Sequence, residues 1–172
     1  MKRFICVFII IFVLMLSSCS QGSDPVDELS IPLKITAKLD GSDVIFTTAI
    51  TEQESNVTFD ESHSLSGTEL HFSEDGNTAK SGDFQKQVKN GTFPAQEAFI
   101  KAIRLLNGKD VLPTDIENGK KYTIDEMTIM VYYDKDTKQL TGIGTEENGR
   151  RFDFIIVGRE PYEVQGNGEG QS

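Results

Sequence analysis

The chain has 172 residues and is acidic, with 27 aspartates and glutamates against 17 lysines and arginines and a formal net charge of -10 at pH 7. A surface of that sign repels nucleic acid and anionic lipid headgroups, which argues against both as partners. The length is that of one ordinary domain, large enough to bury a core without help from a metal or a disulfide.

The first residues have the layout of a secretory signal peptide. Two cations at positions 2 and 3 precede an unbroken apolar run from Phe4 to Leu16, and small residues follow the run. The run is shorter than the ~20 residues that a membrane-spanning helix needs, and it ends in Leu16-Ser17-Ser18-Cys19, which is typical of a bacterial lipobox. The pattern predicts that residues 1–18 are removed as a lipoprotein signal peptide and not kept as a transmembrane anchor.

Cys19 would then become the N-terminus and carry a diacylglycerol on its thiol. Two acyl chains give durable attachment without a spanning helix, so the predicted location is the cell membrane, lipid-anchored, on its extracytoplasmic face. Cys6, the other cysteine of the sequence, would leave with the signal peptide. No thiol would remain for a disulfide, a redox couple or a nucleophile.

The mature chain is expected to have three parts. Residues 19–30 contain the lipidated cysteine and a small, polar segment without an apolar period, which predicts a flexible tether. Residues 31–162 carry the signals of strands and a helix, and they predict a single α+β domain. The tail, residues 163–172, is polar and rich in glycine, which predicts disorder.

Alternation of apolar and polar residues predicts strands on both sides of a central helical segment. Hairpin signals join them, and the strongest is Asn148-Gly149. Met127–Tyr133 is apolar on both faces, which is typical of a central strand covered on both sides. The predicted strands are 33–39, 44–51, 56–59, 68–73, 78–84, 122–124, 127–133, 139–145 and 150–157.

One helix is predicted, over about residues 94–107. Phe99, Ala102, Ile103 and Leu106 fall at helical spacing and form a single apolar stripe. Pro94 suits the first helical position, and a glycine follows the segment as a C-terminal cap. A stripe of this width is expected to lie on a sheet.

Two short stretches and the order of the elements resemble a known class. Leu65-Ser66-Gly67 stands between two predicted strands, and Tyr132-Tyr133-Asp134 opens a late turn and hairpin. With the helix between them, residues 31–158 resemble the bacterial envelope lipoproteins of the LolA/LppX-like class. The resemblance implies an α+β fold in which a strongly curved antiparallel sheet, a half-barrel of about eight or nine strands, packs on one principal helix. It also implies an apolar hollow, which in some members holds acyl chains, and it favours a Gram-positive host.

The usual catalytic and metal-binding patterns are missing from the sequence. His63 and His71 could form a metal pair, but two histidines without cysteine partners are more often surface or packed residues. Asp134-Lys135-Asp136 resembles the start of a calcium loop, yet positions six and twelve, Gln139 and Thr145, break the rule for that loop. We therefore predict no catalytic residue, no metal site, no cofactor and no enzymatic activity.

The first functional hypothesis is a non-enzymatic binding or carrier module for a lipid or another amphiphile. The ligand would lie between the concave side of the sheet and the helix, and the alternative is that the helix fills that hollow and the same residues are ordinary core. The candidate ligand-contacting residues are Phe46, Leu70, Phe72, Phe99, Ile103, Leu106, Ile129, Val131 and Phe154.

The second hypothesis is a surface lipoprotein that binds a protein or cell-wall partner and has no small-molecule ligand. Its contacts would come from exposed segments such as Glu52–Asn56 and Glu61–Ser66. An enzyme with an unfamiliar site is a more distant third.

Overall fold

The computed structural model describes residues 26–162. The predicted signal peptide, the predicted lipidation site at Cys19 and the predicted tail lie outside this range. The elements, in chain order, are η1 (Asp27–Leu29), β1 (Leu33–Leu39), β2 (Ile45–Ile50), β3 (Glu54–Phe59), β4 (Thr68–Ser73), β5 (Gly76–Ser81), β6 (Phe84–Val88), α2 (Pro94–Gly108), β7 (Thr114–Ile116), β8 (Gly119–Ile124), β9 (Met127–Tyr133), β10 (Leu140–Glu147) and β11 (Arg150–Pro161).

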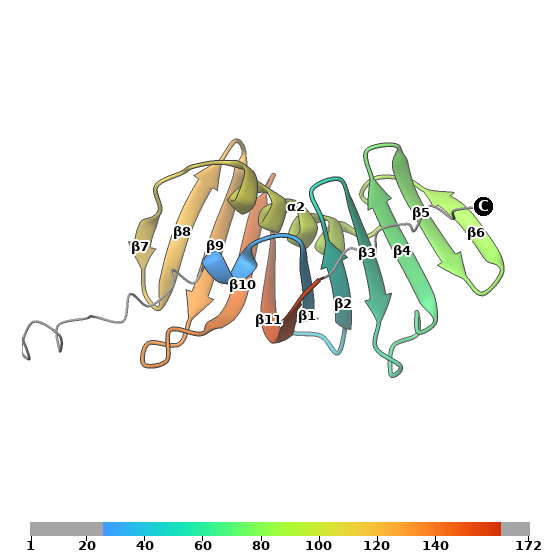
Figure 1. Ribbon diagram of the computed structural model, residues 1–172, viewed down its shortest axis with the longest axis horizontal. Helices are drawn as coiled ribbons and strands as arrows, with labels where there is room; N and C mark the ends of the chain where they lie inside the picture. The colour runs from blue at the N-terminus through green and yellow to red at the C-terminus, as the bar shows by residue number, and fades with distance from the viewer. Residues whose placement is uncertain (1–25, 163–172) are drawn as a thin grey trace, which may run out of the picture.

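All eleven strands belong to one antiparallel, curved sheet (Figure 1). Their order is β6-β5-β4-β3-β2-β1-β11-β10-β9-β8-β7, so that the first and last strands of the chain pair at the centre. In that seam Leu39 lies opposite Phe154. The predicted α+β half-barrel with one principal helix is confirmed, with more strands than the eight or nine expected.

The additional strands lie at the two edges of the sheet. The predicted strand 78–84 is wrong as a single element, because the chain turns at Gly82, whose φ of +56° favours glycine. Ser81 then pairs with Phe84, and the chain returns as β6. At the other edge, β7 is a three-residue strand that was not predicted, and β8 begins at Gly119 instead of Tyr122. β3 begins at Glu54, so part of the segment expected to be an exposed loop is strand.

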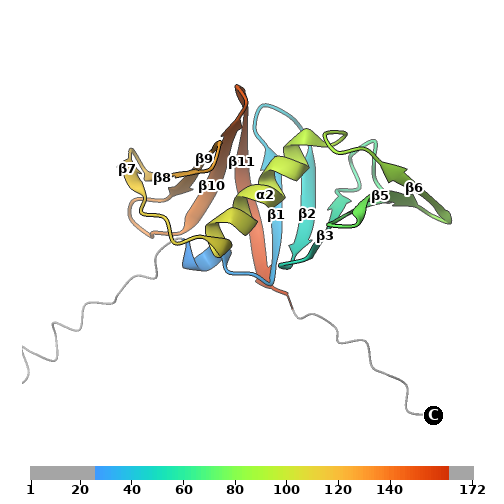
Figure 2. The same ribbon diagram turned by 90° about the horizontal axis from the view of Figure 1, so that it is seen from above.

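α2 lies along the concave side of the sheet, over its middle strands, while β6 lies beyond the N-terminal end of the helix (Figure 2). It begins at Pro94, as predicted, and extends through Gly108. The buried stripe of the helix includes the four residues that its spacing indicated: Phe99, Ala102, Ile103 and Leu106. Within residues 26–162, no helix is long and apolar enough to cross a membrane.

The short helix η1 belongs to the folded domain. Leu29 is fully buried in the core, and its carbonyl accepts a hydrogen bond of 2.8 Å from the side-chain amide of Asn107 in α2. Glu28 forms an ion pair of 2.9 Å with Arg159 of β11. The boundary expected at residue 31 therefore moves toward the N-terminus, and part of the predicted tether is packed structure.

Candidate functional site

The nine candidate ligand-contacting residues lie together in the core. Six of them have no solvent-accessible surface, and the largest exposed fraction among the other three is 9%. A side chain without accessible surface borders no space that holds a water molecule, whether inside the protein or outside it. The structure therefore favours the alternative in which α2 fills the hollow of the sheet.

Three phenylalanines show how the hollow is filled. The rings of Phe99 of α2, Phe46 of β2 and Phe154 of β11 contact one another: the centroids of Phe46 and Phe154 lie 5.5 Å and 4.8 Å from that of Phe99, and both pairs meet edge to face. Edge-to-face aromatic contacts are favourable beyond the area that they bury. The centre of the concave face is therefore packed protein, and space for a ligand lies beside the helix.

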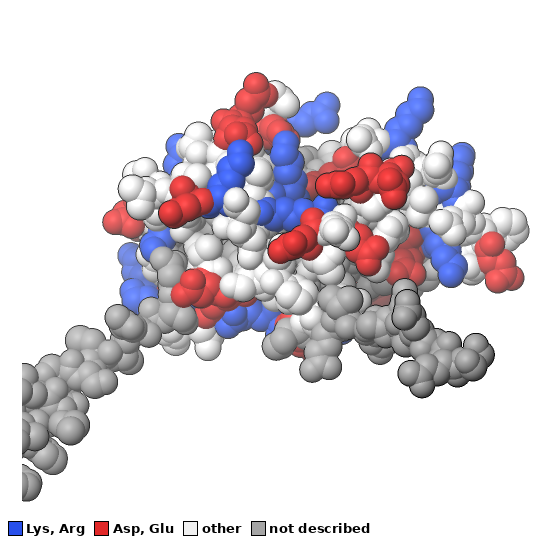
Figure 3. All heavy atoms as spheres, turned by 45° about the horizontal axis from the view of Figure 1, so that its top comes forward, with Lys and Arg blue, Asp and Glu red and all other residues white. Residues whose placement is uncertain are grey.

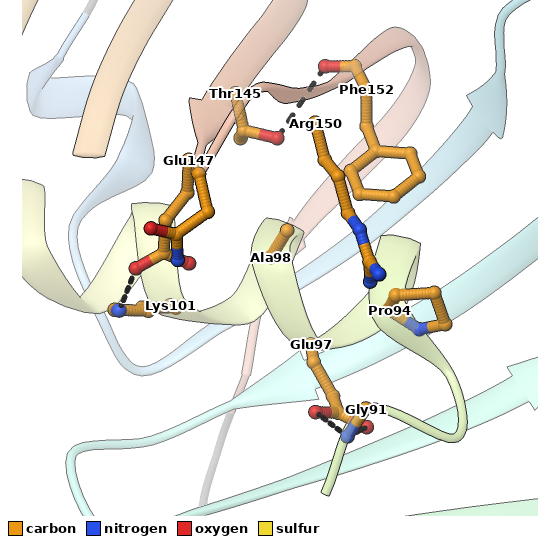
Figure 4. Close-up of a pocket in the computed structure, with 10 residues that line it drawn as sticks. Gly91, Pro94, Glu97, Ala98, Lys101, Thr145, Glu147, Arg150 and Phe152 are labelled. Carbon is orange, nitrogen blue, oxygen red and sulfur yellow. Dashed lines mark hydrogen bonds and ion pairs between the residues drawn. The ribbon is translucent and has the colours of Figure 1, made fainter. Parts of the chain in front are cut away.

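A groove of about 490 Å³ lies between the N-terminal half of α2 and the β10–β11 hairpin (Figure 4). Its lining is mixed: Pro94, Ala98 and Phe152 contribute apolar surface, and charged and polar side chains contribute the rest. The residues that line it are Gly91, Pro94, Glu97, Ala98, Lys101, Thr145, Glu147, Asn148, Arg150 and Phe152.

The β10–β11 hairpin forms one wall of this groove. Asn148 and Gly149 adopt φ values of +51° and +72°, as a two-residue turn of this type requires. The turn sets Glu147 opposite Arg150, and Thr145 lies opposite Phe152. Because side chains alternate along a strand, these four share the concave face. The sequence predicted this turn but not the groove beside it.

The N-terminal turns of α2 form the other wall. The Glu97 carboxylate accepts hydrogen bonds from the backbone N–H of Gly91, at 2.7 and 2.9 Å to its two oxygens, and from that of Phe93 at 3.3 Å. A carboxylate near a helix N-terminus is favoured by the helix dipole. One turn further on, Lys101 forms an ion pair with Glu147 across the groove. Both groove carboxylates are thus engaged in structural contacts.

Arg150 also lines the groove, but unlike Lys101 it forms no ion pair with another residue of the described chain. Among residues 26–162, no hydrogen bond or ion pair engages its guanidinium. In Figure 4 the side chain extends from the hairpin over the groove toward Pro94, with Ala98 and Phe152 close by. A free guanidinium above apolar carbon is suited to an anionic group that carries an apolar body.

A second groove, of about 380 Å³, lies on the opposite flank of the helix, against β4 and β5. Glu97 and Lys101 border both grooves, and Phe72 is the one predicted ligand residue in this lining. Arg104, also in the lining, is held by hydrogen bonds from Nε to the Thr51 carbonyl and from Nη2 to the Ser55 hydroxyl. Burial lowers the pKa of Arg104, and the charge of Glu74 opposes that shift. The Arg104 guanidinium therefore has a structural role in the fold.

The histidines and acidic residues of the described chain do not gather into a metal-binding cluster. Within residues 26–162, no group of three or more His, Cys, Asp or Glu side chains could hold a metal ion. The ring of His63 stacks on Phe59 with centroids 5.1 Å apart. His71 Nδ1 shares a hydrogen bond of 2.7 Å with the side-chain oxygen of Asn56. Each histidine therefore has a structural partner of its own.

The chain is similar to a protein of known structure. No family model matches the chain, and none of the curated proteins searched matches it. Among solved structures, the crystal structure of a LolA superfamily protein from Nitrosomonas europaea is similar, with 10% sequence identity and a TM-score of 0.43. The likeness covers 81% of this chain and 91% of that chain, and it concerns the fold alone.

Proposed function

We propose that the protein is a lipid-anchored, extracytoplasmic binding module without enzymatic activity, and that an anionic amphiphile binds in the groove between α2 and the β10–β11 hairpin. The observation that carries the proposal is the Arg150 guanidinium, which has no hydrogen bond or ion pair among residues 26–162 and ends beside Pro94 in a groove that Ala98 and Phe152 also line. The carboxylate or phosphate of the ligand would bind Arg150, and the first part of its apolar chain would lie on Phe152. A volume of about 490 Å³ is in the usual range for small-molecule sites.

The engaged carboxylates support binding over catalysis. Glu97 is tied to backbone amides and Glu147 to Lys101, so neither is placed as a free acid or base. The location rests on Cys19, because a diacylglycerol there would hold the domain outside the cell membrane. Intact-mass analysis of the native protein tests this part: we expect residue 19 as the N-terminus with a diacylglycerol attached.

A matched pair of variants tests the groove. Arg151 is the next residue along β11, so its side chain points to the other face, where its Nε and Nη2 donate to Asp153 at 2.8 and 3.0 Å. Arg150→Gln and Arg151→Gln thus remove the same charge from opposite faces of the sheet.

Affinity for a fluorescent fatty acid is the measurement. A hydrogen bond to a charged group contributes ~1.5–3 kcal/mol, so Arg150→Gln is expected to weaken binding by roughly 10- to 100-fold. Arg151→Gln is expected to stay within about twofold of the wild type. Equal affinities in all three proteins, or no uptake by the wild type, would contradict the proposal.

One observation favours the second hypothesis, a protein partner. β6 is an edge strand of the sheet, and Phe84 at its start is 84% exposed. Unpaired edges accept a strand from another chain. A photo-crosslinking amino acid at position 84 would capture such a partner in stoichiometric amount, while the same probe at Val157, exposed elsewhere on the sheet, would not.

A further inference from the structure

The loop between α2 and β7 carries the most exposed of the large apolar side chains of the described residues. Leu112 is 91% exposed, although its neighbour Val111 is half-buried and packs against the core. The start of the loop is held by an ion pair of 2.7 Å between Lys109 and Asp125 of the β8–β9 turn. On the C-terminal side of the loop, Thr114 of β7 pairs with Lys121 of β8, so Leu112 projects from a loop that is fixed on both sides.

This loop leaves the helix beside the point where the chain enters the domain. The Asn107 side chain donates to the Leu29 carbonyl at 2.8 Å, and its oxygen accepts from the Ile31 N–H at 3.1 Å. These bonds fasten the end of α2 to η1. Figure 2 shows η1, the end of α2 and the loop to β7 gathered at one corner of the molecule.

The distance from this corner to the lipid anchor is limited by covalent geometry. Seven residue steps separate Cys19 from Val26, and a fully extended chain advances about 3.3–3.6 Å per residue. The corner at η1 therefore stays within about 25 Å of the anchored cysteine, whichever way the domain turns. No other part of the domain is tied to the bilayer so directly.

We propose that the loop Lys109–Pro113 is a membrane-contact loop, whose Leu112 side chain enters the interface of the bilayer that holds Cys19. The inference rests on the lipid anchor of the proposed function. Lys109 is already paired, and Asp110 adds negative charge, so the contact is apolar and suits a zwitterionic lipid surface. It orients the domain with η1 and the end of α2 toward the bilayer. The groove beside the start of α2 then lies at the far end of a helix about 22 Å long.

The absence of tryptophan from the sequence makes a direct test possible. Leu112→Trp and Phe84→Trp each introduce a single fluorophore at an exposed site, one in the loop and one on the distant edge strand. The mature, lipidated proteins are reconstituted into phosphatidylcholine vesicles with or without acyl-chain bromination. We expect Leu112→Trp emission to shift to shorter wavelength and to be quenched by the brominated lipid, and Phe84→Trp emission to be unchanged.

Co-flotation with the vesicles separates this inference from the anchor on which it rests. If the protein floats while the Leu112→Trp emission is neither shifted nor quenched, the loop contact is wrong and the anchor stands. Equal quenching at positions 112 and 84 would also overturn the contact, because the domain would have no fixed orientation. If the protein does not float with the vesicles, the anchor itself is wrong and the loop contact falls with it.

Discussion

Phe99 of α2 meets Phe154 of β11 edge to face, with ring centroids 4.8 Å apart. The contact joins the only long helix of residues 26–162 to the central seam of the sheet, where the first and last strands pair. Figure 3, in which the top of the molecule as seen in Figure 1 comes forward, shows acidic and basic side chains interspersed over this face. Polar contacts of Lys101 with Glu147 and of Arg104 with Ser55 add to the apolar packing of the helix.

Truncating this contact tests whether the helix is a fixed part of the core. Phe99→Ala removes a fully buried ring and is expected to lower the free energy of unfolding by about 3–5 kcal/mol. Phe84→Ala, the same change at an exposed site, is expected to stay within about 0.5 kcal/mol of the wild type. Urea denaturation measures both. Similar small losses in the two variants would mean that α2 is not fixed on the sheet.

Leu29 provides a corresponding test of where the domain begins. Leu29→Ala is expected to cost about 2–5 kcal/mol of unfolding free energy, because the side chain is buried under α2. Leu112→Ala makes the same chemical change at an exposed position, with an expected effect of at most about 0.5 kcal/mol. If thermal or urea unfolding finds Leu29→Ala as stable as Leu112→Ala, η1 is part of the tether after all.

A glycine on β10 allows close packing on the convex side of the sheet. A Cβ at Gly142 would come within 2.8 Å of the Phe154 carbonyl oxygen and 3.5 Å of Tyr132 Cδ2. Because the nearer atom is backbone, Gly142→Ala is expected to destabilise the fold by about 1–3 kcal/mol. Gly158→Ala on β11 is the control, since its Cβ would meet nothing within 4 Å. A denaturation midpoint for Gly142→Ala equal to that of the control would refute the steric argument.

Asp134 gives a prediction about pH. Its carboxylate accepts hydrogen bonds from the Thr137 backbone at 2.8 Å, the Thr137 hydroxyl at 3.0 Å and the Asp136 backbone at 3.0 Å. These bonds lower the pKa of Asp134 below its ordinary value of 3.8. A lowered pKa means that the charged form stabilises the turn. That contribution is complete above pH 3.8 and is lost as the pH falls through the folded-state pKa.

Carboxyl titration by NMR measures this shift directly. We expect the Asp134 midpoint to lie below 3.8 in the wild type and to rise toward that value in Thr137→Val, which lacks the hydroxyl donor but keeps the backbone one. A wild-type midpoint at or above 3.8 would show that these hydrogen bonds do not form in solution.

The sequence predicts much of this fold because its signals are local. Alternation marks the central strands, Pro94 marks the start of the helix, and Asn148-Gly149 marks the final hairpin. β6 was missed because its residues, Phe84–Val88, are almost all exposed, so no buried face imposes alternation. β7 is only three residues long, too short for a period to appear.

The groove could not be predicted from local patterns. Ala98 and Phe152 are far apart in sequence and meet only because α2 crosses the seam between the two halves of the sheet. The nine predicted ligand residues all belong to the buried core. A pattern of apolar residues does not distinguish a filled hollow from an open one. The sequence does contain an indication of the short helix η1, because Val26 and Leu29 have the spacing of one helical turn.

In the proposed function, an amphiphile binds beside α2 and not beneath it. The most direct measurement is the loss of backbone amide signals in NMR spectra when a spin-labelled fatty acid is added to the protein. We predict that the losses centre on Ala98, Thr145 and Phe152, which line the groove. Losses centred on the buried residues Phe46 and Ile129, or on the β6 edge near Phe84, would contradict binding in this groove, and so would a spectrum without localised losses.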